Sequence, residues 1–166
     1  MNHDLSQRDT RQRDIVPPQR LATCHASVIG VGAIGRQVAL QLAAIGVPQL
    51  QLIDPDIVEP VNLATQAYLE SDLGRPKVEA TADLCRQLHG GIYIEAVAQR
   101  FRRSQSAGEA VFVCVDSIAT RKHIHEALRD RVSFFVDGRM SAETLRVLAV
   151  TDAAASDNYT TTLFAP

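Results

Sequence analysis

Cysteine, basic charge and long apolar runs are all scarce in this chain, and each scarcity excludes a class of protein. The three cysteines are odd in number and form no Cys-x-x-Cys pair, so neither a disulfide framework nor a structural zinc site is supported. Basic residues (17) do not outnumber acidic ones (19), so charge gives no reason to expect nucleic acid as a partner. No apolar run approaches the roughly 20 residues that a membrane-spanning helix needs.

The beginning of the chain differs in composition from a secretory leader. Residues 1–20 are polar and mixed in charge, unlike a secretory leader. Together with the unpaired cysteines, this favours a globular, soluble protein of the cytoplasm. The 166 residues, 46% of them hydrophobic, are enough for one domain with its own core. We therefore expect an N-terminal arm over 1–21, broken by Pro17-Pro18, followed by a single domain over 22–166.

Strand and helix signals alternate along that domain, and no internal repeat or low-complexity tract interrupts them. Helices are expected at 35–45, 76–88 and 117–129, and 54–74 reads as a long loop with room for a one-turn helix near Asn62. Short apolar runs predict strands at 26–31, 50–53, 92–97, 110–115, 133–136 and 144–150. This alternation is typical of an α/β, Rossmann-like fold. Its sheet is expected to be mostly parallel, with helices on both faces and some antiparallel strands toward the C-terminus.

The most informative motif is the run from Gly30 to Gly35, Gly-Val-Gly-Ala-Ile-Gly, which joins the first predicted strand to the first predicted helix. In such a loop the first glycine permits a tight turn, the second lets the backbone approach a phosphate, and the third lets helix and strand pack closely. Asp54 follows the last glycine by nineteen positions, at the end of the second predicted strand. Together these features predict a nucleotide-binding βαβ unit, without distinguishing NAD from ATP.

Carboxylates follow several predicted strands directly. Asp54 and Asp56, Asp116, and Asp137 come after apolar runs, and ligands bind at the carboxyl ends of the strands in such sheets. The alternative is that these side chains cap helices or lie in solvated loops. For Asp116 this alternative has weight, because a helix is expected to begin right after it.

Lys77 is a charged residue in an unfavourable position. It stands at the second position of the helix expected to start at Pro76, where a cation opposes the positive end of the helix dipole by roughly 0.3–1 kcal/mol. An anionic partner would explain that placement, and a solvated surface lysine is the alternative.

Other reactive residues give weaker signals. Cys85 and Cys114 lie in apolar segments typical of a core, and Cys24 in a polar stretch has no sign of a nucleophile's surroundings. His123 and His125 are two apart on a predicted helix and so face away from each other, which argues against a metal site. The run 100–103, Arg-Phe-Arg-Arg, is interpreted as a solvated basic loop, with an acidic partner or phosphates as the alternative.

Four motifs together make the sequence similar to the ThiF/MoeB/HesA family, the relatives of ubiquitin-activating enzymes. They are Gly30-x-Gly32-x-x-Gly35, then Leu52-Ile53-Asp54-Pro55-Asp56-x-Val58-Glu59-x-x-Asn62-Leu63, then Gly74-Arg75-Pro76-Lys77, then Val115-Asp116-Ser117 with Arg121. The resemblance runs from about residue 8 to 150. NAD-dependent dehydrogenases share the first motif but lack the others and need a substrate domain, for which 166 residues leave no room.

The resemblance implies ATP- and Mg²⁺-dependent adenylation of the C-terminal carboxylate of a ubiquitin-like protein of β-grasp fold, with release of pyrophosphate. It also implies a homodimer or heterodimer, in which Arg11 reaches the partner subunit's site. The implied nucleotide site comprises Gly30, Gly32, Gly35, Asp54, Asp56, Asn62, Gln66 and Lys77. In it, Asp54 holds the ribose hydroxyls, while Asn62 and Lys77 contact phosphates. Asp116 is the implied magnesium ligand, and the implied catalytic residues are Lys77, Asp116 and Arg11.

Two departures from the family pattern bear on activity. Thr65 stands where a phosphate-binding arginine is expected, so either another cation replaces it or activity is weakened; the candidates are Arg36, Arg75, Arg139 and a partner's Arg11. Members of the family also continue beyond this point, so 22–166 is expected to be a C-terminally incomplete adenylation domain. Two other functions stay open: a non-catalytic or split partner subunit of a heterodimeric activating enzyme, and an NAD-dependent oxidoreductase. Activation of a tRNA nucleoside at the same ATP site is also compatible with these residues.

Overall fold

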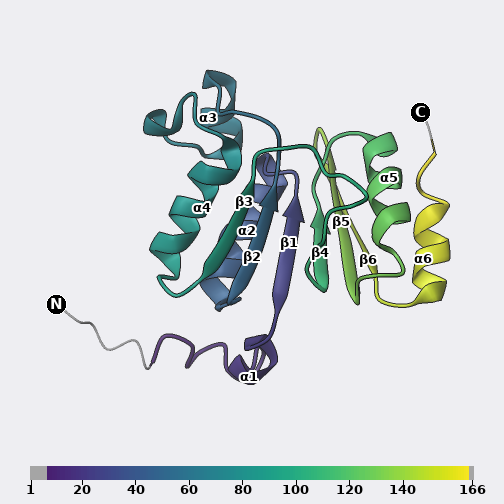
Figure 1. Ribbon diagram of the computed structural model, residues 1–166, viewed down its shortest axis with the longest axis horizontal. Coiled ribbons are helices and arrows are strands. Elements are labelled where there is room, and N and C mark those ends of the chain that lie inside the picture. The colour runs from purple at the N-terminus through teal and green to yellow at the C-terminus, as the bar shows by residue number, and fades with distance from the viewer. Residues whose placement is uncertain (1–6, 165–166) are drawn as a thin grey trace.

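The computed structural model describes residues 7–164 as a twisted sheet of six strands in the order β3-β2-β1-β4-β5-β6 (Figure 1). The strands are β1 His25–Ile29, β2 Gln49–Ile53, β3 Tyr93–Val97, β4 Ala110–Val113, β5 Phe134–Ser141 and β6 Thr144–Val150. The first five are parallel, and β6 pairs antiparallel with β5. The predicted Rossmann-like, mostly parallel sheet with antiparallel pairing toward the C-terminus is therefore confirmed.

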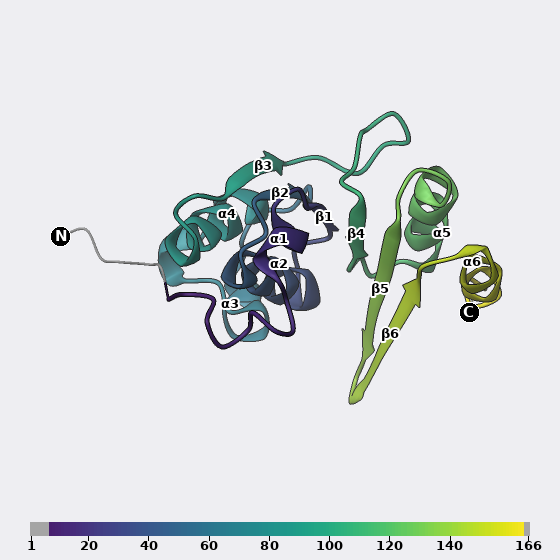
Figure 2. The same cartoon turned by 90° about the horizontal axis from the view of Figure 1, so that it is seen from below.

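Helices cover both faces of this sheet (Figure 2). They are α1 Pro18–Leu21, α2 Ala33–Ile45, α3 Pro60–Gln66, α4 Lys77–Leu88, α5 Ile118–Leu128 and α6 Ala153–Thr160, with a short 3₁₀ turn η1 Glu70–Asp72. Helices α2 and α4 lie on one face, and α5 and α6 lie on the other. Within residues 7–164 no helix is both long and apolar enough to cross a membrane.

Two hydrophobic cores follow from the alternation of side chains along the strands. Val28 of β1 packs with Ala39 of α2 and Val78 of α4 in the first core. Its neighbour Ile29 points to the other face and packs with Ile124 of α5 in the second. Because both faces of β1 are buried, the strand reads as a continuous apolar run, as parallel strands do.

The main differences from the expected elements concern α3, β5 and α6. Helix α3 extends well beyond one turn, since Pro60 starts it and the side chains of Glu59 and Asn62 form a capping box. Strand β5 continues to Ser141, because β6 folds back and pairs with it from Phe135 to Ser141. Helix α6 was not predicted at all, although Asp152 caps it by accepting a hydrogen bond from the Ala155 amide at 2.8 Å.

The N-terminal arm, as far as the structure describes it, packs against the helices at the amino edge of the sheet. The Arg8 guanidinium donates to the carbonyls of Ala43 and Ala44 at 3.1 and 2.9 Å, and it also reaches the Leu88 carbonyl at 3.4 Å. Gln12 donates to the Ile45 carbonyl at 2.9 Å. A single arginine therefore caps the carboxyl ends of both α2 and α4, where the helix dipole favours a cation.

Replacing Arg8 by alanine removes these caps, and we expect a loss of about 1 kcal/mol, or roughly 2–4 °C in melting temperature. The measurement is thermal unfolding followed by circular dichroism. Arg13→Ala is the matched control, because Arg13 is exposed and is expected to leave the melting temperature unchanged. Equal melting temperatures for the two variants would contradict a stabilising role for the arm.

Candidate nucleotide-binding site

A cavity of about 750 Å³ opens at the carboxyl edge of the sheet, above β1, β2 and β4. Most of the residues implied by the family resemblance lie around it: Gly30, Gly32, Asp54, Asp56, Gln66, Lys77 and Asp116. Parallel strands place their carboxyl ends at one edge, so residues far apart in sequence meet there. Their roles toward a ligand stay predictions.

The glycine loop has the geometry that close packing demands. Gly30 has a positive φ of 89°, and a Cβ there would lie 2.8 Å from the Cys114 carbonyl, so no other residue fits. A Cβ on Gly35 would clash with the Gly30 carbonyl oxygen, and Gly35 therefore acts in helix packing without lining the cavity. Gly32 is open, and the first turn of α2 behind it presents amide groups that lack helical acceptors. That turn is suited to an anion.

Asp54 ties the end of β2 to the glycine loop. Its carboxylate accepts hydrogen bonds from the Val31 amide at 2.6 Å and from the Asp56 amide at 2.8 Å. Burial raises the pKa of Asp54, while these two amides oppose the shift. Each carboxylate oxygen still has a second acceptor site, so both can receive a further hydroxyl from a ligand.

Lys77 has the anionic partner that its position called for. Its side chain is buried, and Nζ lies 3.2 Å from Oδ2 of Asp56, whose own side chain is 62% exposed. The Lys77 amide also donates to the Asp56 carbonyl at 2.9 Å. The ammonium is thus held at the cavity by an exposed carboxylate, which a stronger anion such as a phosphate can replace.

The two implied site residues on α3 have different roles. Asn62 is buried and accepts from the Glu59 amide at 2.9 Å; it caps its helix and does not line the cavity. Gln66 does line it, and its Oε1 is buried without a hydrogen-bond donor from the described part of the chain. Thr65 is exposed and donates to the Val61 carbonyl, so its hydroxyl serves the helix.

A buried arginine fastens α3 to the glycine loop. Arg36 donates to Thr81 Oγ1 at 3.1 Å and to the Ala67 carbonyl at 3.0 Å, and it stacks over the Tyr68 ring at 4.1 Å. The Tyr68 hydroxyl in turn donates to the Val31 carbonyl at 2.7 Å, and burial raises the pKa of Tyr68 to about 12. The end of α3 that carries Gln66 is therefore fixed to the loop.

Asp116 is exposed at the end of β4, and within residues 7–164 it forms no hydrogen bond or ion pair. The neighbouring Ser117 caps α5 by accepting from the Thr120 amide at 3.3 Å. The capping alternative for Asp116 is therefore wrong, and its carboxylate faces the cavity unpaired.

Asp137 corrects the expectation that every strand-end aspartate belongs to the ligand edge. It lies inside the lengthened β5, fully buried, and pairs with Arg121 and with Arg139. Its neighbour Gly138 lines the cavity in its place. The error arose because β5 was expected to end at Val136.

The cations proposed to replace an arginine at Thr65 have other partners. Arg75 pairs with Asp72 and Asp83, and Arg139 with Asp137, while Arg36 is occupied as described. Arg11 is exposed in the arm, at the amino edge and away from the cavity of its own chain. Its proposed role in a partner's site stays a prediction.

Sequence reasoning missed one wall of the cavity, which the β3–β4 loop supplies. Gln99, Arg100 and Phe101 line it together with His123 of α5, and the Phe101 and His123 rings meet edge to face at 6.4 Å. Arg100 is exposed, as the solvated-loop interpretation expected, whereas Phe101 is half-buried; both line the cavity, which the sequence did not reveal. The sequence does not reveal the pairing of β3 with β2, which brings this loop beside Asp54.

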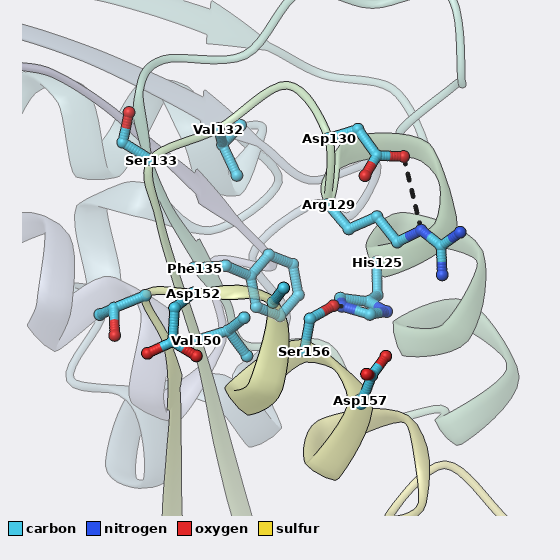
Figure 3. Close-up of a pocket in the computed structure, with 12 residues that line it drawn as sticks. His125, Arg129, Asp130, Val132, Ser133, Phe135, Val150, Asp152, Ser156 and Asp157 are labelled. Atoms are coloured by element: carbon cyan, nitrogen blue, oxygen red, sulfur yellow. Dashed lines mark hydrogen bonds and ion pairs between the residues drawn. The ribbon is translucent and has the colours of Figure 1, made fainter.

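His125 points away from this cavity, into a second one of about 540 Å³ between α5 and α6 (Figure 3). Its ring packs on Phe135 and Tyr159, its Nε2 lies 3.1 Å from Ser156 Oγ, and burial lowers its pKa. His123 and His125 thus face apart, as their spacing predicted. No cluster of three or more metal-ligating side chains occurs in residues 7–164.

The cysteines show no sign of activation. Burial raises the pKa of both Cys85 and Cys114 to about 11, and it also raises that of Cys24. Thiols with raised pKa values carry little thiolate near neutral pH. The expectation that Cys85 is a core residue is confirmed, whereas Cys114 lies at the inner wall of the cavity.

Comparison with known proteins identifies relatives of this chain. It is 30% identical over 139 residues to the SAMP-activating enzyme E1 of Haloferax volcanii, covering 76% of this chain and 52% of the relative. It is 33% identical over 115 residues to the sulfur carrier protein ThiS adenylyltransferase of Escherichia coli, covering 66% and 46%. The chain thus spans about half the length of these relatives.

A solved structure agrees in fold. The crystal structure of selenomethionine PaaA superposes with a TM-score of 0.77 at 22% identity, over 91% of this chain and 52% of that one. The profile described as the ThiF family matches residues 9–161, nearly the whole chain. With the glycine loop, the strand-end carboxylates and Lys77 around one cavity, the match establishes that this chain belongs to the ThiF family.

Proposed function

We propose that this chain is the ATP-binding part of an adenylyltransferase that transfers AMP to the C-terminal carboxylate of a ubiquitin-like β-grasp protein and releases pyrophosphate. The observation that carries the proposal is the single cavity in which the open glycine loop, Asp54, Lys77 and the unpaired Asp116 converge. The relatives support it, since one is named for adenylating a sulfur carrier protein and another for activating SAMP proteins.

The nucleotide would lie across the carboxyl edge of β1 and β2. The ribose hydroxyls donate to the Asp54 carboxylate, and the phosphates meet the free amides at the start of α2. Lys77 exchanges its contact with Asp56 for a phosphate oxygen. Gln66, whose amide side chain lacks a donor for its buried oxygen, is placed to bond the same ligand.

Magnesium fits Asp116 as its protein ligand. Mg²⁺ prefers hard oxygen ligands and is usually held by one or two carboxylates together with substrate phosphates and water. An exposed, unpaired carboxylate in the cavity suits that scheme, and so does the lack of a three-ligand cluster in residues 7–164. When bound, the ion would neutralise charge on the departing pyrophosphate.

The reaction itself needs little acid–base help. The acceptor carboxylate is ionised at neutral pH and attacks the α-phosphorus, the bond from that phosphorus to the bridging oxygen of pyrophosphate breaks, and an acyl-adenylate forms. The residues present serve to align the attacking group and to stabilise charge. Lys77 and the α2 amides supply positive potential, and a general base is not required.

An apolar strip beside the cavity supports a protein as the acceptor. Met140, which lines the cavity, pairs across the β5–β6 hairpin with Leu145, and Val147 follows on the same face. These side chains are 57%, 63% and 62% exposed, and Figure 2 shows the hairpin projecting beyond the rest of the sheet. Exposed apolar strips of this kind mark interaction surfaces.

One observation favours a second candidate, a nucleotide-binding but non-catalytic subunit of a heterodimer. Thr65 supplies no cation to the cavity, and Arg36, Arg75 and Arg139 are all engaged elsewhere, so beside Lys77 and the paired Arg121 only the exposed Arg100 of the β3–β4 loop lines the cavity as a cation in residues 7–164. ATP–pyrophosphate exchange separates the two candidates when the ubiquitin-like proteins of the source organism are offered one at a time. Exchange that requires an acceptor with its C-terminal glycine supports the enzyme, whereas ATP binding without exchange supports the subunit.

Lys77→Ala and Asp116→Ala are each expected to lower the exchange rate at least ~100-fold, as the loss of a transition-state electrostatic contact typically does. Lys122→Ala is the matched control, since Lys122 is exposed on α5 outside the cavity. Wild-type exchange in either test variant would remove that residue from the machinery.

A double variant, Leu145→Glu with Val147→Glu, tests the acceptor surface. We expect Mg·ATP affinity to stay unchanged and the concentration of acceptor that gives half-maximal exchange to rise at least ~10-fold, because two buried apolar contacts are lost on binding. Titration of acceptor at saturating ATP measures this. An unchanged acceptor titration would place the acceptor elsewhere.

A further inference from the structure

A buried charge cluster joins the C-terminal helix to the loop that carries Asp116. Asp137 lies at its centre, fully buried in β5. Arg121 of α5 pairs with it from one side, and Arg139 from the other, with Nε 2.6 Å from Oδ2. The Tyr159 hydroxyl of α6 donates to the same Oδ2 at 2.9 Å.

Arg121 connects the charge cluster to the cavity through hydrogen bonds to the backbone. Its guanidinium donates to the Val115 carbonyl, immediately before Asp116, and to the Gly138 carbonyl at 3.2 Å. The side chain is only 5% exposed, yet it lines the cavity. The planar guanidinium of Arg121 therefore holds the backbone at two points of the cavity wall, at Val115 and at Gly138.

The orientation of Arg121 depends on Asp137. A guanidinium buried to this degree is costly without a carboxylate, and burial together with the charge of Arg139 lowers the pKa of Arg121. The Asp137 carboxylate compensates the charge of both arginines and fixes the orientation of the Arg121 guanidinium. Tyr159 and Thr162 complete the cluster, since Arg139 also donates to the Thr162 carbonyl and hydroxyl at 3.1 and 2.9 Å.

We propose that Asp137 and Arg121 are positioning residues that hold Asp116 where it meets the metal–nucleotide complex, and that helix α6 acts on the site through Tyr159. The inference rests on the proposed function, because it takes Asp116 as the magnesium ligand. An isolated loop carboxylate would sample many positions. The bond to the Val115 carbonyl removes that freedom before the ligand arrives, which lowers the entropic cost of binding.

The test compares ATP affinity in the presence of Mg²⁺ and of EDTA, by calorimetry, in wild type and variants. The main variant is Arg121→Met with Asp137→Asn, which neutralises both members of the Arg121–Asp137 pair. Arg139, whose side chain is 15% exposed, loses its carboxylate partner too but keeps its hydrogen bonds to Thr162, and the new amide in β5 can still bond Tyr159 and Arg139. Exchanging a buried ion pair for neutral groups of similar volume is often tolerated. Arg103→Met is the matched control, since Arg103 forms a half-exposed ion pair with Glu126 outside the cavity.

We expect the double variant to lose at least ~10-fold of the affinity gained from Mg²⁺ and to keep its affinity in EDTA within about 3-fold. Amide hydrogen exchange at residues 115–118 is expected to quicken in the free protein, and Arg103→Met to match wild type in both measurements. Tyr159→Phe, which removes a single hydroxyl, is expected to shift both readouts in the same direction by a smaller amount. The Tyr159→Phe variant still tests the proposal if the double variant does not fold.

The outcomes are separable. If wild type gains affinity from Mg²⁺, Asp116→Ala abolishes that gain, and the folded pair variant keeps it, the positioning inference alone is overturned. If wild type binds no ATP, or Asp116→Ala retains the full gain, the proposed role of Asp116 fails and the positioning role fails with it. A lower melting temperature with an unchanged magnesium gain would leave the pair a purely structural feature.

Discussion

The carboxylate of Asp54 is the interaction on which the rest of the site depends. It accepts the Val31 amide of the glycine loop and the Asp56 amide of the next turn, and so joins the ends of β1 and β2. Through Asp56 it also sets the start of α4, because the Lys77 ammonium and amide both bind that residue. Three segments thus converge on one buried acid, and the cavity keeps its shape before any ligand enters.

Buried cations organise the two flanks of the cavity. Arg36 fixes the α3 segment through Tyr68 and Thr81, and Arg121 fixes the Asp116 loop through Asp137. In both places a charge removed from water is compensated by a ring, a carboxylate or backbone carbonyls. Lys77 and Asp116, the groups proposed to bind the ligand, have one exposed partner and none, respectively, among residues 7–164, and so stay available to a ligand.

The sequence predicted the fold class and most of the residues that line the cavity, but it predicted some of the surrounding elements less well. The glycine spacing and Asp54 located the cavity, because the ends of β1 and β2 follow from local pattern and carboxyl strand ends meet at one edge. The cluster around Asp137 was missed because it depends on antiparallel pairing of β5 with β6 and on α6, and a helix of weak amphipathicity gives little local signal. The place of Arg100 and Phe101 at the cavity was missed because only the pairing of β3 with β2 brings their loop there.

Calorimetric titration of this chain with ATP in the presence of Mg²⁺, and in parallel with NAD, tests the central claim most directly. A Rossmann-like fold serves both ligands, so the fold does not decide between them; in our proposal Asp116, Lys77 and Gln66 do. The account predicts saturable binding of ATP that strengthens with Mg²⁺, and no binding of NAD at the same concentrations. Binding of NAD in place of ATP, or of neither nucleotide, would contradict it.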